Sequence, residues 1–451
     1  MPSRPLTYRR IVAFWIPLAG TWLMMSVEGP YLAAIIARLD APVTNLAAFG
    51  IAFAFAIIIE SPVIMLMSAS TALVEDRESY FALRRFSYGL GAILTLVQLA
   101  ILAPPIFGVL ATGLSLPDDV AGLAHGGLAL MLPWTAAIGY RRFRQGLLIR
   151  NGFTRRVAYG TVVRLCAMSA TALVACQVST LPGAHIGALA LSVGVVLEAV
   201  VSRVMTAGLL PRVLERRRDP DRLASLRLPS LLSFYTPLAL ASVLALASQP
   251  TVTFFMGQSR YALESLAALP VIHGLTFIFR SLGLSYLEVV IALVGHNREH
   301  YPMIRNFALA LGIGATAGLS LIAFTPLAVF WFRDISGLSA ELTRFALTPT
   351  RILAILPAFS VLLAFQRGLL VHAHRNAPAT WATLVELIGI ASLLTIGIHW
   401  LHLVGAVAAA VAIVTARVAS TIWLAPTCWD VLRHRPELSP EIAAPAGPQT
   451  S

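Results

Sequence analysis

Eleven ionisable residues lie inside apolar stretches of this 451-residue chain. The acids are Glu28, Glu60, Glu198, Glu288 and Glu386, and the bases are Arg164, Arg203, Arg280, Arg351, Arg367 and Arg417. An ionisable side chain within an apolar membrane segment costs free energy, and such residues usually bind ions, transfer protons or hold a charged solute. These eleven positions are therefore the candidates for chemistry.

Glu28 has the most distinctive surroundings. It directly precedes Gly29 and Pro30; proline removes a backbone hydrogen bond and glycine loosens packing, which frees carbonyl groups beside the carboxylate. This arrangement suits a proton or a sodium ion, and we predict Glu28 as the ion-coupling residue. The alternative is an acid near the outer end of its helix that simply meets water.

Positive charge gathers in the second half of the chain. Arg351 and Arg417 lie there with Glu386 as the only obvious deep partner. Because arginine binds carboxylate and phosphate in bidentate fashion, an uncompensated cluster favours an anionic substrate. The predicted substrate-binding or gating residues are Glu60, Arg280, Arg351, Glu386 and Arg417.

Three other embedded charges are expected to have a simpler explanation. Arg203, Arg367 and Glu288 lie within a turn or two of the predicted cytoplasmic helix ends. Snorkelling of these side chains to the interface accounts for them.

The composition identifies the elements that carry these residues. The chain is 58% hydrophobic and 12% charged, with a mean hydropathy of +0.80, whereas an ordinary soluble domain has about 25% charged residues. A membrane crossing needs about 20 apolar residues. The apolar segments number twelve: 11–37, 44–72, 87–113, 121–148, 157–179, 185–210, 230–257, 262–293, 306–331, 341–371, 380–400 and 404–428. These predict an all-α polytopic membrane protein with twelve transmembrane helices.

Arginine sets the expected orientation. All 33 basic residues are arginine; with both termini in the cytoplasm, the inner loops and tails hold 23 of them, six from Arg141 to Arg156. The outer loops hold only Arg38, Arg260, Arg333 and Arg344. This bias places both termini in the cytoplasm and indicates that the net charge of +12 faces anionic lipid, not nucleic acid.

The two halves of the chain show an internal repeat. At an offset of 220 residues, ten positions are identical, among them Pro17 with Pro237 and Pro30 with Pro250. The run FRQGLLI from Phe143 matches FQRGLLV from Phe365 at an offset of 222. Six helices return the chain to the same side, so the halves are expected to be parallel repeats about an axis along the membrane normal.

The repeat defines the expected domains: an N-lobe (1–210), a basic cytoplasmic linker (211–229), a C-lobe (230–428) and a disordered cytoplasmic tail (429–451). It also makes Glu60 and Arg280 equivalent positions of opposite sign. They would pair across a central cleft when it closes at one end, or else each would form an ion pair within its own lobe.

Several short motifs resemble a known superfamily. They are Pro17 followed by Val27-Glu28, the run Leu46 to Ala52 that opens the second helix, and RQGLLIRNGFTRR from Arg144. With the duplicated six-helix plan, they resemble the multidrug/oligosaccharidyl-lipid/polysaccharide (MOP) flippase superfamily, which includes the multidrug and toxic compound extrusion (MATE) transporters. Within it, the run Ser233 to Ala239 is most similar to the progressive ankylosis (ANK) family. This resemblance implies a MATE-like architecture of twelve helices.

The resemblance also implies a function. ANK-like proteins are associated with export of small organic anions such as citrate and nucleotides, whereas MATE transporters export organic cations with a proton or sodium gradient; the MATE pattern makes Glu28 the coupling acid. We therefore expect a secondary active exporter of small, anionic organic solutes that works by alternating access. The alternatives are a MATE-type cation antiporter and a lipid-linked precursor flippase.

The remaining expectations concern chemistry and location. The sequence contains no motif for nucleotide hydrolysis, metal hydrolysis or dinucleotide binding, so we expect no enzyme and no cofactor beyond a coupling H⁺ or Na⁺. Its three cysteines lack metal-ligand spacing. The expected partners are a small-molecule substrate and the lipid bilayer, with the protein a monomer. The Lys-free, Ala- and Arg-rich composition suggests a bacterial cytoplasmic membrane.

Overall fold

The computed structural model describes residues 6–113, 116–216, 228–295 and 298–433. Twelve helical spans in this part of the chain are long and apolar enough to cross a membrane, as predicted. They are 8–36, 44–73, 77–102, 118–150, 154–178, 183–207, 228–256, 264–293, 301–324, 340–372, 377–400 and 405–433. The chain thus has the predicted all-helical class.

The first six spans form the N-lobe. Its helices are α1 (Tyr8–Ile36), α2 (Pro42–Glu60), the 3₁₀ turn η1 (Ser61–Val63), α3 (Leu66–Leu73), α4 (Arg77–Leu102), α5 (Pro104–Gly113), α6 (Asp118–Leu130), α7 (Leu132–Arg150), α8 (Thr154–Val178), α9 (Gly183–Ala207) and α10 (Leu210–Leu214).

The other six spans form the C-lobe. Its elements are α11 (Leu228–Met256), α12 (Ala262–Leu284), α13 (Tyr286–Leu293), α14 (Tyr301–Phe324), α15 (Leu327–Val329), the π-helical η3 (Phe330–Ile335), α16 (Ala340–Leu353), α17 (Leu356–His372), α18 (Ala377–Thr395), the π-helical η4 (Ile396–Trp400) and α19 (Gly405–Arg433).

The third span of each half begins earlier than predicted. The segment expected at 87–113 runs over 77–102, and the one expected at 306–331 runs over 301–324. Charged residues such as Arg84 and Arg85 lie within the first turns of α4, where Asp76 forms a capping box with Ser79. Proline then limits each span, since Pro104 and Pro326 follow the last helical turns.

The predicted linker and tail fall mainly outside the described residues. Most of the described part of the linker belongs to α10 and α11, with Glu215 and Arg216 following α10. Helix α19 continues through Arg433 into the segment predicted as tail. Residues 217–227 and 434–451 lie outside the described ranges.

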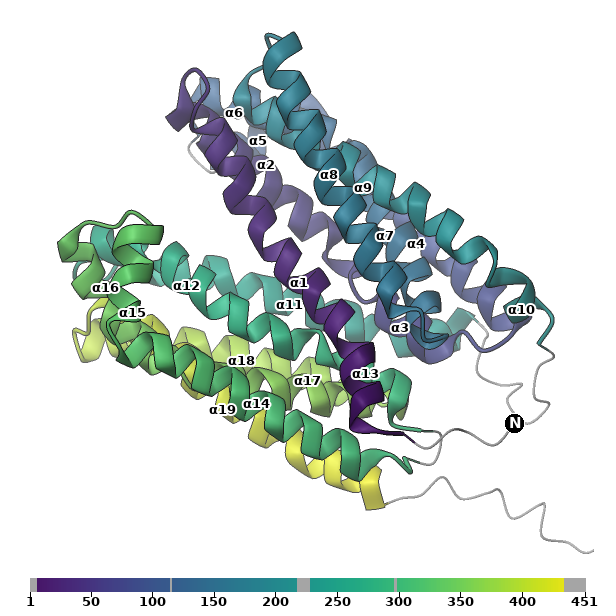
Figure 1. The fold of residues 1–451 in the computed structure, drawn as a ribbon. Helices are drawn as coiled ribbons and strands as arrows, with labels where there is room; N and C mark the ends of the chain where they lie inside the picture. Colours follow the sequence, from purple (N-terminus) through teal and green to yellow (C-terminus); the bar gives the residue numbers. More distant parts are fainter. Residues whose placement is uncertain (1–5, 114–115, 217–227, 296–297, 434–451) are drawn as a thin grey trace, which may run out of the picture.

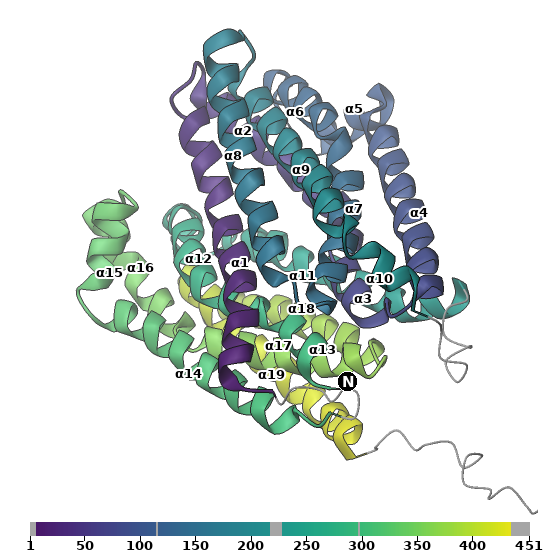
Figure 2. The ribbon, with the colours of Figure 1, turned by 45° about the vertical axis from the view of Figure 1, so that its right-hand side comes forward.

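The two bundles are arranged as a V (Figures 1 and 2). Their ribbons converge at the end where the described chain begins in α1 and diverge toward the other end, where α15 and α16 of one lobe lie opposite α2 and α6 of the other. We call the converging end the closed end and the other the open end. The last described turn of α19 also lies at the closed end.

The internal repeat is visible in the helix bounds and in matched hydrogen bonds. Each span of the C-lobe begins 220 to 224 residues after its N-lobe counterpart. In the N-lobe, the side-chain oxygen of Asn45 accepts from the backbone N–H of Ala184 at 2.9 Å. In the C-lobe, Ser265 accepts from Ala406 at 3.1 Å. An acceptor at the start of the second span thus satisfies the first turn of the sixth span in both lobes.

A second matched contact requires glycine. A Cβ on Gly146 of α7 would lie 2.5 Å from the Met67 carbonyl oxygen, and one on Gly368 of α17 would lie 2.6 Å from the Val290 Cβ and 3.2 Å from the Leu287 carbonyl oxygen. Met67 and Leu287 are equivalent at the 220-residue offset. Glycine therefore lets the fourth span of each lobe cross the short helix α3 or α13 at close range.

Candidate functional site

Two matched hydrogen bonds join the lobes at the closed end. The indole N–H of Trp15 in α1 donates to the carbonyl of Leu282 at 3.3 Å and to Ser285 Oγ at 2.8 Å. The hydroxyl of Tyr235 in α11 donates to the carbonyl of Pro62. Trp15 and Tyr235 are equivalent at an offset of 220, as are Pro62 and Leu282. Each lobe thus donates from its first span to the break in the second span of the other.

The same two donors also pack their rings across the interface. The Trp15 ring meets Phe307 of α14 edge-on with centroids 5.8 Å apart. The Tyr235 ring meets Phe86 of α4 edge-on at 4.9 Å. Edge-to-face pairs at such distances are favourable. We call the four residues, with the carbonyls that they engage, the aromatic latch.

A third contact joins equivalent residues directly. The Ser68 hydroxyl of α3 donates to Glu288 Oε1 of α13 at 2.5 Å, and both residues are 2% exposed. Their numbers differ by 220, so the contact lies where the axis relating the two repeats passes between the lobes. Glu288 was expected to reach the interface by snorkelling, and that expectation is wrong because the carboxyl is held between the two lobes.

The N-lobe encloses a chain of ion pairs that includes Glu28. Arg164 of α8 pairs through Nη2 with Glu28 and lies 3.4 Å through Nε from Glu198 of α9. Glu198 also lies 2.9 Å from Arg141 and accepts from Gln145 at 3.0 Å, both of α7. Glu28 is therefore a buried, paired carboxylate, 8% exposed, and the alternative of an acid that simply meets water does not hold.

Three arginines of this region lie inside a helix and not in the predicted cytoplasmic loop. Arg141, Arg142 and Arg144 were counted among the cytoplasmic loop residues that orient the chain, but they lie within α7 with exposures of 2%, 5% and 7%. Their positions next to Arg150 and Arg155 imitate a loop cluster. A signal was present in the repeat, because the motif containing Arg144 aligns with an apolar helix in the second half.

Glu60 and Arg280 do not meet in this conformation. The Glu60 carboxylate accepts from the indole N–H of Trp134 within its own lobe, and no ion pair joins it to Arg280 in the described part of the chain. Arg280 instead lies within electrostatic range of Arg417 and Glu386. Pairing of Glu60 with Arg280 in another conformation stays a prediction.

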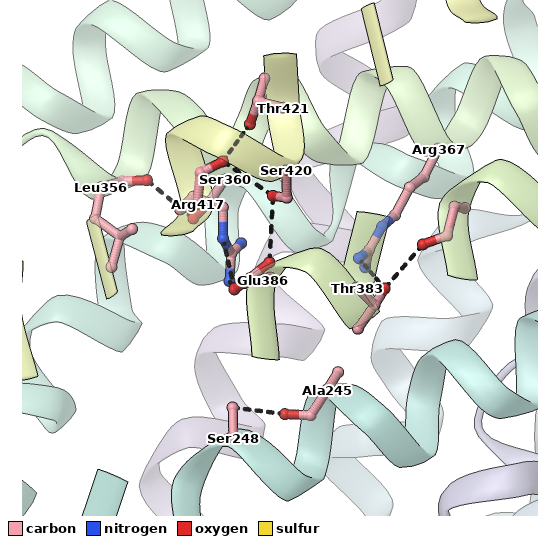
Figure 3. A network of polar contacts seen from close by, with 11 residues as sticks. Ala245, Ser248, Leu356, Ser360, Arg367, Thr383, Glu386, Arg417, Ser420 and Thr421 are labelled. Carbon is pink, nitrogen blue, oxygen red and sulfur yellow. Dashed lines mark hydrogen bonds and ion pairs between the residues drawn. The ribbon is translucent and has the colours of Figure 1, made fainter. Parts of the chain in front are cut away.

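The C-lobe gathers a second cluster of charges (Figure 3). Arg417 of α19 holds Glu386 of α18 through Nε at 3.0 Å and Nη2 at 2.6 Å, and Ser420 lies 3.4 Å from the same carboxylate. Arg367 of α17 lies on the other side of Glu386 and donates to Thr383 at 2.7 Å. The predicted partnership of Glu386 with the arginines of this lobe is present, with Arg417 as the direct partner.

Two arginines differ from the roles that we expected. Arg351 is exposed on α16, where its Nε donates to the Ala323 carbonyl at 3.3 Å and its guanidinium lies over Phe324, so it is not part of the cluster. Arg367 was expected to snorkel, yet its Nε is buried. It lies within electrostatic range of Glu386 and Arg417.

Solved structures share the fold of this chain. An outward-facing MATE family transporter of the MOP superfamily matches with a TM-score of 0.77 at 14% identity, covering 94% of this chain and 97% of the other. The chain has the MATE fold. A MOP superfamily transporter from Pyrococcus furiosus, whose structure is described as having a binding pocket of reverse polarity, matches at 0.73 with 14% identity and the same coverage. A mutant MATE transporter of Vibrio cholerae matches at 0.73 with 16% identity, again with coverage of 94% and 97%.

The MATE likeness rests on structure alone. No protein-family model matches the chain, and no curated protein matches it by sequence. The MATE-like twelve-helix fold that the motifs suggested is confirmed by the solved structures, whereas membership of the MOP superfamily and the finer resemblance to the ANK family stay predictions.

Proposed function

We propose that the protein is a secondary active exporter, not an enzyme, that moves small organic anions by alternating access. The observation that carries the proposal is the aromatic latch. Trp15 and Tyr235 make equivalent contacts from opposite lobes, and the lobes converge at that end alone. Two repeated bundles that pack against each other through noncovalent contacts at one end can rock about the space between them.

The arginine bias supports the orientation. With Arg141, Arg142 and Arg144 removed from the count, the described loops and helix ends at the closed end still hold most of the described loop arginines, which supports a cytoplasmic position for this side. The first structural neighbour is described as outward-facing, which agrees with a V that opens away from the cytoplasm. We place the protein as a monomer in a bacterial cytoplasmic membrane, close to the ANK family.

Glu28 is the proposed site of coupling to H⁺ or Na⁺. Among the described residues its one ion-pair partner is Arg164, whereas Glu198 faces two arginines and Gln145. Binding of a cation at Glu28 would weaken its ion pair with Arg164, while the negative charge of Glu198 would still be balanced by its arginine partners. Glu28 can therefore change its charge state at lower cost than Glu198.

The proposal is tested by flux from proteoliposomes loaded either with citrate-like anions or with a lipophilic cation dye, with and without an imposed pH gradient. We expect anion flux that depends on the gradient and little cation flux. Cation flux without anion flux would contradict the anionic substrate and favour a MATE-type antiporter. Absence of flux of either solute, with flip of a labelled lipid, would favour the flippase.

A further inference from the structure

We propose that α12, α17, α18 and α19 build a binding site for a dianionic organic solute, such as a dicarboxylate or a phosphate monoester. Arg280 and Arg367 bind the ligand in this site, and the Arg417–Glu386 pair holds the cluster together. The inference rests on the proposed function and names its substrate class.

The first argument is the charge of the cluster. Arg280 lies on α12, which packs against α17 and α19, and Arg367 of α17 lies beside Glu386; both arginines are within electrostatic range of Glu386 and Arg417. Three guanidinium groups thus share one carboxylate, which leaves a formal charge of +2 inside a membrane-spanning bundle. Buried charge of one sign is costly without a partner, and in the described residues no second carboxylate pairs with these arginines.

The second argument is the hydrogen-bonding capacity that remains. The Nε atoms of Arg280 and Arg367 are buried, and neither has a hydrogen-bond partner among the described residues. The Nε atom of Arg417, by contrast, donates to Glu386. As whole residues, Arg280 and Arg367 are only partly buried, so neither is sealed inside its bundle.

The third argument comes from the internal repeat. Arg280 is equivalent to Glu60, and Arg367 to Gln145 at the 222-residue offset of the matching motif. In the N-lobe, three arginines (Arg141, Arg142 and Arg164) stand with three acids (Glu28, Glu60 and Glu198). The charges grouped around Glu198 are therefore balanced, with Arg144 set apart on Thr206, whereas those grouped around Glu386 carry an arginine excess, so the repeated framework does not itself require the excess.

The charge and geometry together favour a dianion. A monoanion would leave one positive charge uncompensated, and a cation would increase the repulsion. Arg367 and Arg417 lie on opposite sides of Glu386 (Figure 3). Arg280 lies on α12 and Arg367 on α17. Each can present its planar fork to a carboxylate or to a phosphate group.

Isothermal titration calorimetry on the detergent-purified full chain tests the proposal. The probes are succinate, phenyl phosphate and, as a monoanion, propionate. We expect at least one dianion to bind about tenfold or more tightly than propionate. Arg367→Gln, which installs the residue of the N-lobe equivalent, and Arg280→Gln should each weaken dianion binding by about tenfold or more.

Arg351→Gln is the matched control, because Arg351 is an exposed arginine of the same lobe outside the cluster; it should leave the affinity unchanged. Arg367→Lys keeps the positive charge and replaces the glutamine variant in the test if that variant fails to fold. The lysine variant should bind the dianion more weakly than the parent, because an ammonium group lacks the planar donor geometry of a guanidinium.

Three outcomes would overturn the site: propionate binding as tightly as both dianions, no dianion binding, or unchanged affinity in folded Arg280 and Arg367 variants. Because the titration needs no gradient, its failure is separate from failure of the exporter proposal. Gradient-driven anion flux with unaffected variants would reject only this site, whereas dianion binding without flux would reject only transport.

Discussion

At the scale of single residues, the two lobes manage buried charge differently. In the N-lobe, Arg164 links Glu28 to Glu198, and Glu198 is further held by Arg141. In the C-lobe, Glu386 forms an ion pair with Arg417 and lies near two more arginines. A buried carboxylate with several cation partners is locked in place, whereas arginines that share one carboxylate retain binding capacity.

We predict that Glu28→Gln uncouples transport. The amide cannot bind or release a proton and makes a weaker contact with Arg164, so gradient-driven anion flux should fall at least tenfold while substrate affinity changes less than about threefold. Parallel flux and titration measurements on the purified variant check this. Glu341→Gln is the control, because Glu341 is exposed in the first turn of α16. Coupled transport at the parent rate by Glu28→Gln would remove Glu28 from the coupling role.

The sequence revealed which residue types lie inside the bundles but not which of them meet. Glu386 and Arg417 could be matched because few charges lie deep in the second half. Arg351 could not be separated from the cluster, since its exposure depends on which face of α16 packs inward. Arg164 was found as an embedded base, but its partners Glu28 and Glu198 come from helices far apart in the chain.

At the scale of helices, close packing and local breaks place the contacts. The breaks between α2 and α3 and between α12 and α13 expose the carbonyls of Pro62 and Leu282 to the latch donors. The apolar runs predicted all twelve spans. The boundary of the third span of the N-lobe was wrong because hydropathy counts arginines such as Arg77 as loop, whereas a capping box can start a helix among them.

We predict that Gly146→Ala and Gly368→Ala each destabilise the protein. The added Cβ would clash with backbone or branched side chains of α3 and α13, and overpacking of this kind typically costs about 1–3 kcal/mol. Thermal unfolding in detergent measures the effect. Gly50→Ala is the control, since its Cβ would meet nothing within 4 Å. Unfolding temperatures equal to that of the control variant would show that the crossings are looser than described.

We predict that Trp15→Phe and Tyr235→Phe weaken the closed end. Each substitution keeps most of the ring contact but removes the hydrogen-bond donor to a carbonyl of the other lobe. Each should therefore lower the free energy that holds the lobes together by about 0.5–1.5 kcal/mol. Hydrogen exchange of α3 and α13, followed by mass spectrometry, should rise in both variants and rise further in the double variant. Trp381→Phe changes an exposed tryptophan and should have no effect. Unaltered exchange in the double variant would show that the latch does not hold the lobes together.

At the scale of the whole molecule, duplication explains both the fold and its expected motion. The ten identities at an offset of 220 indicated two parallel bundles. The structure extends this equivalence to the latch, to the glycine crossings and to the contact between Ser68 and Glu288. The closed end could not be predicted, because either end of such a pair of bundles can close and the choice depends on small differences between interlobe contacts.

The most direct test of alternating access measures two distances between pairs of spin labels by double electron–electron resonance, in a chain whose native cysteines are replaced. One pair of spin labels at Ala72 and Ala292 reports on the closed end, and one at Asp40 and Arg260 reports on the open end; each pair occupies equivalent positions of the repeat. On changing pH or adding a transported anion, we predict that the closed-end distance lengthens while the open-end distance shortens in the same population. If both distances stay fixed under every condition that supports flux, or if both lengthen together, the protein does not work by alternating access.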